Sequence, residues 1–325
     1  MVGQRLVWWG RTGLVIGLAL LSVVGCGRLL GLGGNSASSG VTGNHAAAGG
    51  RSGSAVASSG VASSGVVSPG AGVALPGTGV PSSAAGVPSS GSAGQAAAGK
   101  GAGAGGLVLA GKVVGLDPGH NGGNFTHPAA IDQQIWNGRE WEDCNTTGTA
   151  TDGGYTEALF NFQVAGYLRA DLLADGARVV MTRTSNSGVG PCVNQRAAIM
   201  NAAHVNVGIA IHADGAAPAG HGFAILVPVP DGHNDNVISS SLAFAQDVRT
   251  SMLAGTPMPI SNYDGVDGIQ PRDNLAGLNL TQVPMALIEV GNMRNGTDAA
   301  LETSSAFQQE VARALCAAIV TFLRP

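Results

Sequence analysis

Hydrophobic residues follow two patterns between residue 107 and the C-terminus. Short apolar runs bounded by glycine, proline or polar residues are typical of buried strands, and they lie at 113–116, 178–183, 205–211, 222–227 and 283–289. Longer stretches repeat apolar residues every three or four positions, which predicts helices at 155–175, 194–203, 239–253 and 306–323. Strands that alternate with helices predict a single α/β domain. Its mixed, mostly parallel twisted sheet is expected to be covered by helices on both faces.

The segment 121–154 differs from the rest of this domain because it is long, polar and rich in glycine, asparagine and aspartate. Loops of this length inside a compact domain are usually functional. The segment carries Trp136, Trp141 and Cys144. We therefore expect it to fold over a groove or to line one.

The first 26 residues have the composition of a lipoprotein-type signal peptide. Arg5 and Arg11 form a positive start, and the apolar run at 12–25 is too short for a comfortable membrane span. Small residues before Cys26 resemble a lipobox, which would make Cys26 the lipidated first residue of the mature chain. Cleavage elsewhere and an uncleaved signal anchor are the alternatives. Each predicts an exported protein of the cell envelope, on the outer side of the cytoplasmic membrane or in the periplasm.

Residues 27–106 are mostly glycine, serine, alanine and valine with scattered proline. They hold too few large apolar side chains to offset the entropy of ordering, which predicts a disordered N-terminal tether. Such a linker would let a lipid-anchored domain sweep the space beyond the membrane, and a spacer of no consequence is the alternative. The remaining residues, 107–325, are enough for one domain with a sizeable core.

Charge is divided unevenly along the chain. All 20 acidic residues lie at or beyond Asp117, whereas five of the 16 basic residues precede residue 107. The C-terminal domain is therefore clearly acidic. A nucleic-acid-binding module normally presents a basic face, so we expect no nucleic acid partner.

The chain has four cysteines, and an exported domain lies in a compartment that permits disulfides. Cys144 and Cys192 each lie in a polar, glycine-rich loop, so we predict that they form a disulfide. Cys316 lies on the apolar face of the last predicted helix and is expected to be a small core residue. Cys26 is assigned to the lipid.

Four side chains with metal or acid–base chemistry are predicted to meet at one edge of the sheet. His120, His212 and Glu289 each end a predicted strand, and Glu157 lies in the first turn of a helix. The carboxyl ends of parallel strands share one edge. Two imidazoles, one carboxylate and an open position form the ligand set of a catalytic zinc, and a further carboxylate would serve as general base. The spacing alone leaves open which glutamate takes which role.

Six short motifs follow one another through the domain. They are Leu116-Asp-Pro-Gly-His120-Asn-Gly-Gly, Gly154-Tyr-Thr-Glu157, Met181-Thr-Arg183, Arg196 with Asn201, Ala210-Ile-His212-Ala-Asp214 and Pro284-Met-Ala-Leu-Ile-Glu289-Val-Gly-Asn-Met-Arg-Asn295. In this order they resemble the zinc-dependent N-acetylmuramoyl-L-alanine amidases of bacterial cell walls, over residues 112–323. The resemblance implies one zinc ion bound by His120, Glu157 and His212, with Glu289 as the catalytic base.

The resemblance also implies a substrate and a reaction. Such an enzyme hydrolyses the amide bond between the lactyl group of N-acetylmuramic acid and the L-alanine of the peptidoglycan stem peptide. A zinc peptidase acting on the stem peptide is one alternative, and a non-catalytic peptidoglycan-binding lipoprotein is another. The chain departs from the family in a longer segment between His120 and Glu157. It also has no recognisable separate wall-binding module.

Further residues have weaker assignments. Asp117 and Asp214 could orient the ligand imidazoles, but capping of turns is an equal alternative. Arg272 and Asn292 are candidate contacts of the glycan-peptide.

The motif arginines, Arg183 and Arg196, are expected to brace the fold through ion pairs. We expect the protein to be a monomer and to meet the membrane only through its lipid anchor.

Overall fold

The computed structural model describes residues 107–324. The predicted signal peptide with Cys26 and the predicted linker lie outside the described residues. Six strands form the main sheet, and their bounds are β1 Val113–Pro118, β4 Arg178–Met181, β5 Val207–Asp214, β6 Ala224–Pro228, β7 Ile269–Arg272 and β8 Met285–Asn292. The order across the sheet is β4-β1-β5-β8-β6-β7.

Strand direction divides this sheet into two parts. The first four strands in the order, from β4 to β8, run parallel to one another. β6 pairs with β8 in the antiparallel direction, and β7 runs parallel to β6. This arrangement confirms the predicted mixed, mostly parallel sheet.

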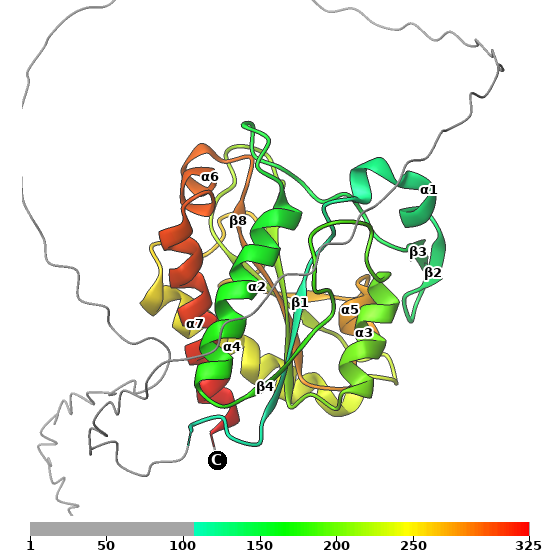
Figure 1. The fold of residues 1–325 in the computed structure, drawn as a ribbon, viewed down its shortest axis with the longest axis vertical. Helices are drawn as coiled ribbons and strands as arrows, with labels where there is room; N and C mark the ends of the chain where they lie inside the picture. Colours follow the sequence, from blue (N-terminus) through cyan, green and yellow to red (C-terminus); the bar gives the residue numbers. More distant parts are fainter. Residues whose placement is uncertain (1–106, 325) are drawn as a thin grey trace, which may run out of the picture. The chain divides into compact units, whose positions relative to one another are not determined.

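Helices cover both faces of the sheet. Their bounds are α1 Pro128–Ile131, α2 Glu157–Ala174, α3 Val193–Ala202, α4 Ile238–Gly255, α5 Ala276–Asn279, α6 Gly296–Glu302 and α7 Ser305–Leu323, with 3-10 turns η1 Asn124–Thr126 and η2 Asp235–Val237. α2, α4 and α7 pack together on one face, whereas α3 and α5 lie on the other (Figure 1). Within the described residues, α7 is the one helix that is long and apolar enough to cross a membrane, and 61% of its apolar window is buried in the domain. That degree of burial is typical of a core helix.

Alternation along the strands decides what each face contains. In β5, Ile209, Ile211 and Ala213 are buried in the main core, together with apolar residues of α2, α4 and α7. The residues between them, Ala210 and His212, therefore point to the opposite face. The same strand thus supplies the core on one side and the candidate site on the other.

The structure differs from the predicted elements in several places, and short α5 and α6 are among the elements that were not predicted. β5 and β8 continue past their predicted ends, so His212 and Glu289 lie within strands rather than at their ends. The predicted loop 121–154 contains α1 and a hairpin of β2, Gln134–Trp136, and β3, Trp141–Asp143. β7 was not predicted, because Ile-Gln-Pro-Arg lacks a strand pattern; its proline is tolerated on an edge strand.

Candidate metal centre and active site

His120 lies in the turn that follows β1, in a backbone conformation that few side chains adopt. Its φ is +56°, in the left-handed region where a non-glycine residue persists only if the surrounding structure holds it. Nδ1 of the imidazole donates a hydrogen bond to the carbonyl oxygen of Thr146 at 3.1 Å. This bond fixes the ring and leaves Nε2 to face the site.

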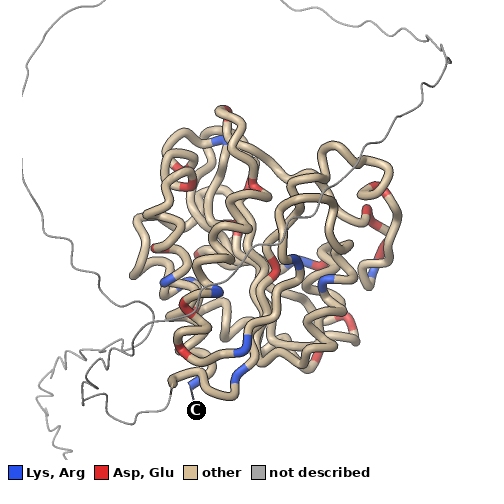
Figure 2. Tube along the Cα trace, viewed as in Figure 1, with Lys and Arg blue, Asp and Glu red and all other residues tan. Residues whose placement is uncertain are grey.

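Two buried arginines hold the turn that carries His120. The guanidinium of Arg196 donates to the carbonyl oxygens of Pro118 at 2.8 Å and His120 at 2.9 Å, and it forms an ion pair with Asp117. Arg183 donates to the carbonyl oxygens of Pro118 at 2.7 Å and Gly119 at 3.1 Å. Burial, with the nearby charge of Arg196, lowers the pKa of Arg183 to about 9. Figure 2 shows that charged residues are sparse along the domain. Arg183 and Arg196 are buried, and their contacts give them a positioning role.

The two arginines differ in whether they form the ion pairs that were expected of them. Arg183 was expected to form an ion pair, but its donors go to backbone carbonyls, including that of Ala158, and to the side-chain oxygen of Asn186. Arg196 does form the expected ion pair with Asp117. Asp117 also accepts from the Thr182 hydroxyl at 2.6 Å, and despite burial the cation of Arg196 lowers the pKa of Asp117. Asp117 thus anchors the arginine rather than an imidazole.

Glu157 opens α2 and is the carboxylate on which both imidazoles converge. Its Oε1 lies 3.1 Å from Nε2 of His120 and 2.9 Å from Nδ1 of His212. Its Oε2 accepts the backbone N–H of Thr149 at 3.0 Å. Burial alone would raise the pKa of Glu157, but the two histidines hold it well below its ordinary value. Glu157 is therefore an anion at neutral pH, as a metal ligand must be.

The three side chains form a compact set of donors. One ligand atom from each of His120, Glu157 and His212 lies within 4.8 Å of the others. The two imidazole rings are 4.9 Å apart between centroids and nearly perpendicular, at 82°. Two nitrogen donors and one carboxylate oxygen, close enough to share one ion, fit a divalent metal of the zinc type.

Glycine is required where the backbone approaches this set. A Cβ on Gly119 would lie 2.1 Å from Cε1 of the His212 ring. A Cβ on Gly148, where φ is +73°, would lie 2.7 Å from Oε2 of Glu157. Any larger residue at either position would displace a member of the set.

Glu289 lies beside this set but does not belong to it. In the β5–β8 pairing Glu289 is directly opposite His212, so both side chains point to the same face. Its Oε2 has no hydrogen-bond partner among the described residues. Burial raises the pKa of Glu289 well above its ordinary value, and the negative charges of Glu157, Asp214 and Asp264 add to this shift. The arrangement places a basic carboxylate next to a metal-binding set.

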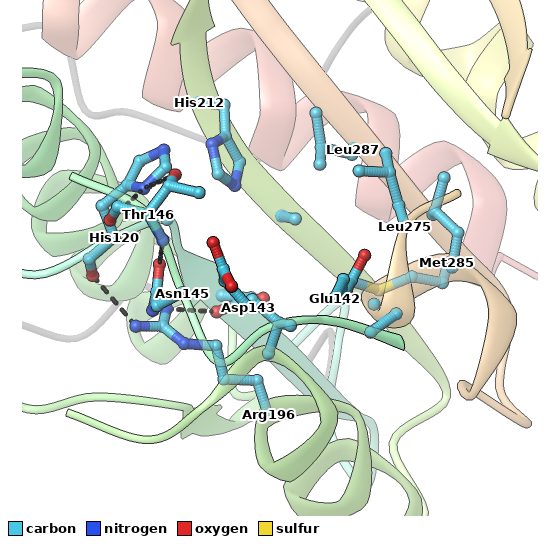
Figure 3. Close-up of a pocket in the computed structure, with 17 residues that line it drawn as sticks. His120, Glu142, Asp143, Asn145, Thr146, Arg196, His212, Leu275, Met285 and Leu287 are labelled. Carbon is cyan, nitrogen blue, oxygen red and sulfur yellow. Dashed lines mark hydrogen bonds and ion pairs between the residues drawn. The ribbon is translucent and has the colours of Figure 1, made fainter. Parts of the chain in front are cut away.

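A cavity of about 340 Å³ opens beside the two histidines. Figure 3 shows His120 and His212 at one end and the apolar side chains Leu275, Met285 and Leu287 at the other. Glu142 and Asp143 of β3 lie between these two ends. The cavity can therefore hold a ligand that is apolar in part while its reacting group lies at the histidines.

The profile of a known protein family matches residues 114–321, nearly all of the described domain. Its description is "N-acetylmuramoyl-L-alanine amidase". The chain belongs to this amidase family. Like its relatives it is therefore an enzyme that acts on peptidoglycan, as the motifs indicated.

Similar proteins and solved structures carry the same amidase description as the family. N-acetylmuramoyl-L-alanine amidase Rv3717 of Mycobacterium tuberculosis is 40% identical over 216 residues, which are 66% of this chain and 88% of that protein. Ami1 of Mycobacterium smegmatis is 40% identical, with a TM-score of 0.63 over 66% of this chain and 98% of that structure. Ami1 of Mycobacterium abscessus is 39% identical, with a TM-score of 0.60 over 66% of this chain and all of that structure (100%).

The remaining assigned residues of this amidase have less direct places. Asp214 accepts the backbone N–H of Gly215 at 2.6 Å, which is the capping alternative. Asn292 is fully buried, and its amide holds the carbonyls of Ala217 and Gly220. Its side chain is thus committed to a loop, which argues against the expected contact with the glycan-peptide. Arg272 donates to Asn274, and its charge opposes the raised pKa of Glu289.

The predicted disulfide is present. Cys144 and Cys192 are joined, with Cα atoms 4.5 Å apart, and this bond links the end of the hairpin to the start of α3. Cys316 is fully buried, as expected, but it is not a free cysteine, so its assignment as a simple core residue is incomplete. The prediction missed Thr146, the acceptor for His120, since nothing in a threonine-rich loop marks one carbonyl.

Proposed function

We propose that this amidase cleaves the amide bond between the lactyl group of N-acetylmuramic acid and the L-alanine of the stem peptide, with one zinc ion held by His120, Glu157 and His212. The observation that carries the proposal is the convergence of both imidazoles on Oε1 of Glu157, with Glu289 directly opposite His212. When bound, zinc acts as a Lewis acid that acidifies the attacking water and polarises the scissile carbonyl.

Glu289 carries the proton in this proposal. Its raised pKa makes it a stronger base than an ordinary glutamate, and its Oε2 has no competing partner among the described residues. Oε2 accepts a proton from the water as the C–O bond forms. The same carboxyl then donates the proton to the nitrogen of L-alanine as the C–N bond breaks. The products are the free lactyl carboxylate and a peptide with a free amino terminus.

The second part of the proposal concerns the cellular location of the enzyme. We propose that it is exported, anchored through a lipid on Cys26, and active as a monomer at the cell envelope. The composition of residues 1–106 supports this, with a lipobox-like run before Cys26 and a glycine- and serine-rich tether. Detergent-phase partitioning of the full chain and of Cys26→Ala tests the anchor.

One series of variants of the full chain tests the chemistry. Glu289→Gln should lower turnover of purified peptidoglycan by about 10²–10⁴-fold while zinc content stays at that of the unmodified protein. His212→Ala should lose both turnover and zinc, measured by elemental analysis. His233→Ala, which changes an exposed loop histidine, is the matched control and should alter neither.

The products decide between the amidase and the peptidase alternative. Mass spectrometry of the digest should find peptides that begin with L-alanine and a glycan with free lactyl groups. Shortened peptides still attached to glycan would contradict the proposed bond. Wild-type turnover by Glu289→Gln would contradict the proposed role of that residue.

A further inference from the structure

Two tryptophans stand exposed on the hairpin that borders the active site. Trp136 and Trp141 are directly paired across β2 and β3, with ring centroids 5.8 Å apart and an angle of 66° between the rings. Their exposed fractions are 46% and 66%. The large core aromatics, by contrast, are completely buried. Exposed indoles lose the stabilisation that burial provides, so a contiguous pair of them marks a surface that meets a partner.

The hairpin holds this tryptophan pair in a fixed place. Asn137 at the turn donates to Glu142 at 3.0 Å, and Arg139 donates to the carbonyl oxygen of Pro230 at 2.6 Å. The Cys144–Cys192 disulfide ties the end of β3 to α3. In Figure 1 the hairpin lies at the flank of the domain beside α1. The pair is therefore preorganised, which lowers the entropy cost of binding.

The tryptophan pair lies on the same hairpin as two residues of the cavity wall. Glu142 and Asp143 line the cavity that also contains His120 and His212, although neither indole lines it. Side chains alternate along a strand and each residue adds about 3.3 Å, so Asp143 is on the same face of β3 as Trp141 and about 7 Å along the strand from it. A polymer whose reacting group is at the histidines can therefore extend past Asp143 to the indoles.

We propose that the tryptophan pair is a glycan subsite, on which a pyranose ring next to the reacting N-acetylmuramic acid stacks. The proposal rests on the proposed function, because it takes the glycan strand of peptidoglycan as the partner. A pyranose presents a flat face of C–H groups, and an indole presents a flat apolar face with negative potential, so the two attract when stacked. Hydroxyl and acetamido groups at the ring edge stay in water. A peptide alone would offer no such repeating faces.

A stacking subsite on the hairpin would help to retain the enzyme on its polymeric substrate. The alternative is that the indoles only stabilise the hairpin as a cross-strand aromatic pair.

Binding of peptide-free glycan separates these explanations. The probe is a preparation of N-acetylglucosamine–N-acetylmuramic acid strands from which all stem peptides have been removed, titrated into the full chain in a calorimeter. The unmodified protein should show a saturable heat of binding. Trp136→Ala/Trp141→Ala should show none, and Trp141→Tyr, which keeps a smaller ring face, should bind more weakly than the unmodified protein. Phe125→Ala removes another exposed aromatic, in η1 outside the hairpin, and should bind as the unmodified protein does.

Kinetics supply the second readout. Two soluble substrates carry the same stem peptide, one on a single N-acetylmuramic acid and one on a tetrasaccharide. The double variant should lower the ratio of kcat/KM for the tetrasaccharide to that for the monosaccharide by roughly tenfold, since one aromatic stacking contact is worth about that much. An unchanged ratio or unchanged glycan binding in the double variant overturns the proposal. This holds even if the melting temperature of that variant is lower, because the indoles would then only stabilise the hairpin. Glycan binding by the unmodified protein without release of peptides from peptidoglycan would instead contradict the proposed function and leave the subsite standing.

Discussion

The two faces of the central sheet are built from the same strands but differ in what they bury. On the face covered by α2, α4 and α7, the residues of β8 are Ala286, Ile288 and Val290, all completely buried. On the opposite face the same strand presents Leu287, which lines the cavity, and Glu289, which lies opposite His212. One face is filled by packing, and the other leaves room for a ligand. Since the side-chain period of a strand is two, both depend on a single register.

Neighbouring residues of β8 offer the largest test of this difference. Ile288→Ala removes a side chain from the closed core, and it should lower the free energy of unfolding by about 2–5 kcal/mol. Leu287→Ala removes a side chain that already borders the cavity. It should cost less, about 1–2 kcal/mol, because fewer packing partners are lost. Urea denaturation of both variants measures the two values.

The effects of the two substitutions on KM should have the opposite order to their effects on stability. Folded Ile288→Ala should keep its KM for a soluble muramoyl-peptide, whereas Leu287→Ala should raise it, because the cavity wall has changed. Equal stability losses for the two variants, or an unchanged KM for Leu287→Ala, would contradict the division into a packed face and a ligand-binding face.

Much of this comparison could be predicted from the sequence. The apolar runs predicted the five strands in which core and site residues alternate. They also placed His120, His212 and Glu289 at one edge, because parallel strands share their carboxyl ends. The exact ends were missed, since His212 and Glu289 interrupt an apolar run. A polar residue inside a strand is indistinguishable from a residue after it until the partner strand is known.

Other features depend on contacts that no local pattern encodes. The hydrogen bond from Arg196 to the carbonyl oxygen of His120 joins residues 76 positions apart. The hairpin of β2 and β3 has strands of only three residues each, too short for a clear alternation. β7 is an edge strand interrupted by Pro271. In each case tertiary structure, not local propensity, decides the conformation.

The domain buries some carboxyl groups with hydrogen-bond partners and others without them, and the two kinds differ in charge. Glu157 accepts several hydrogen bonds at the site. Glu302, in α6, is fully buried and neither carboxyl oxygen has a hydrogen-bond partner among the described residues. Burial, with the negative charges of Asp298, Glu157 and Asp214, raises the pKa of Glu302 to about 8. Glu302 is therefore neutral in the folded protein below that pH.

Glu302→Gln should stabilise the protein increasingly as the pH rises. An unfolded glutamate loses its proton near pH 4.5, whereas folded Glu302 keeps it up to about pH 8. Between these values the unfolded state binds fewer protons, so the stability of the unmodified protein falls as the pH rises. The variant escapes this loss and should be more stable by about 2–4 kcal/mol at pH 8–9 but equal at pH 4. Thermal unfolding across this range measures the difference. A pH-independent difference would contradict it, and Glu310→Gln, on the partly exposed side of α7, should show little effect.

The smallest effect should come from the polar contacts that position the site rather than from its ligands. Arg196 donates to two carbonyls of the His120 turn and to Asp117 with one rigid, planar group. Arg196→Lys keeps the charge but cannot satisfy these acceptors together, so the left-handed turn should loosen. Zinc affinity and kcat/KM should each fall by about 10–100-fold, while urea denaturation shows a smaller loss than for Ile288→Ala. Arg169→Lys, at an exposed position of α2, is the matched control. Unchanged affinity for the proposed zinc ion in Arg196→Lys would mean that the hydrogen bonds of Arg183 and the surrounding packing are enough to hold His120.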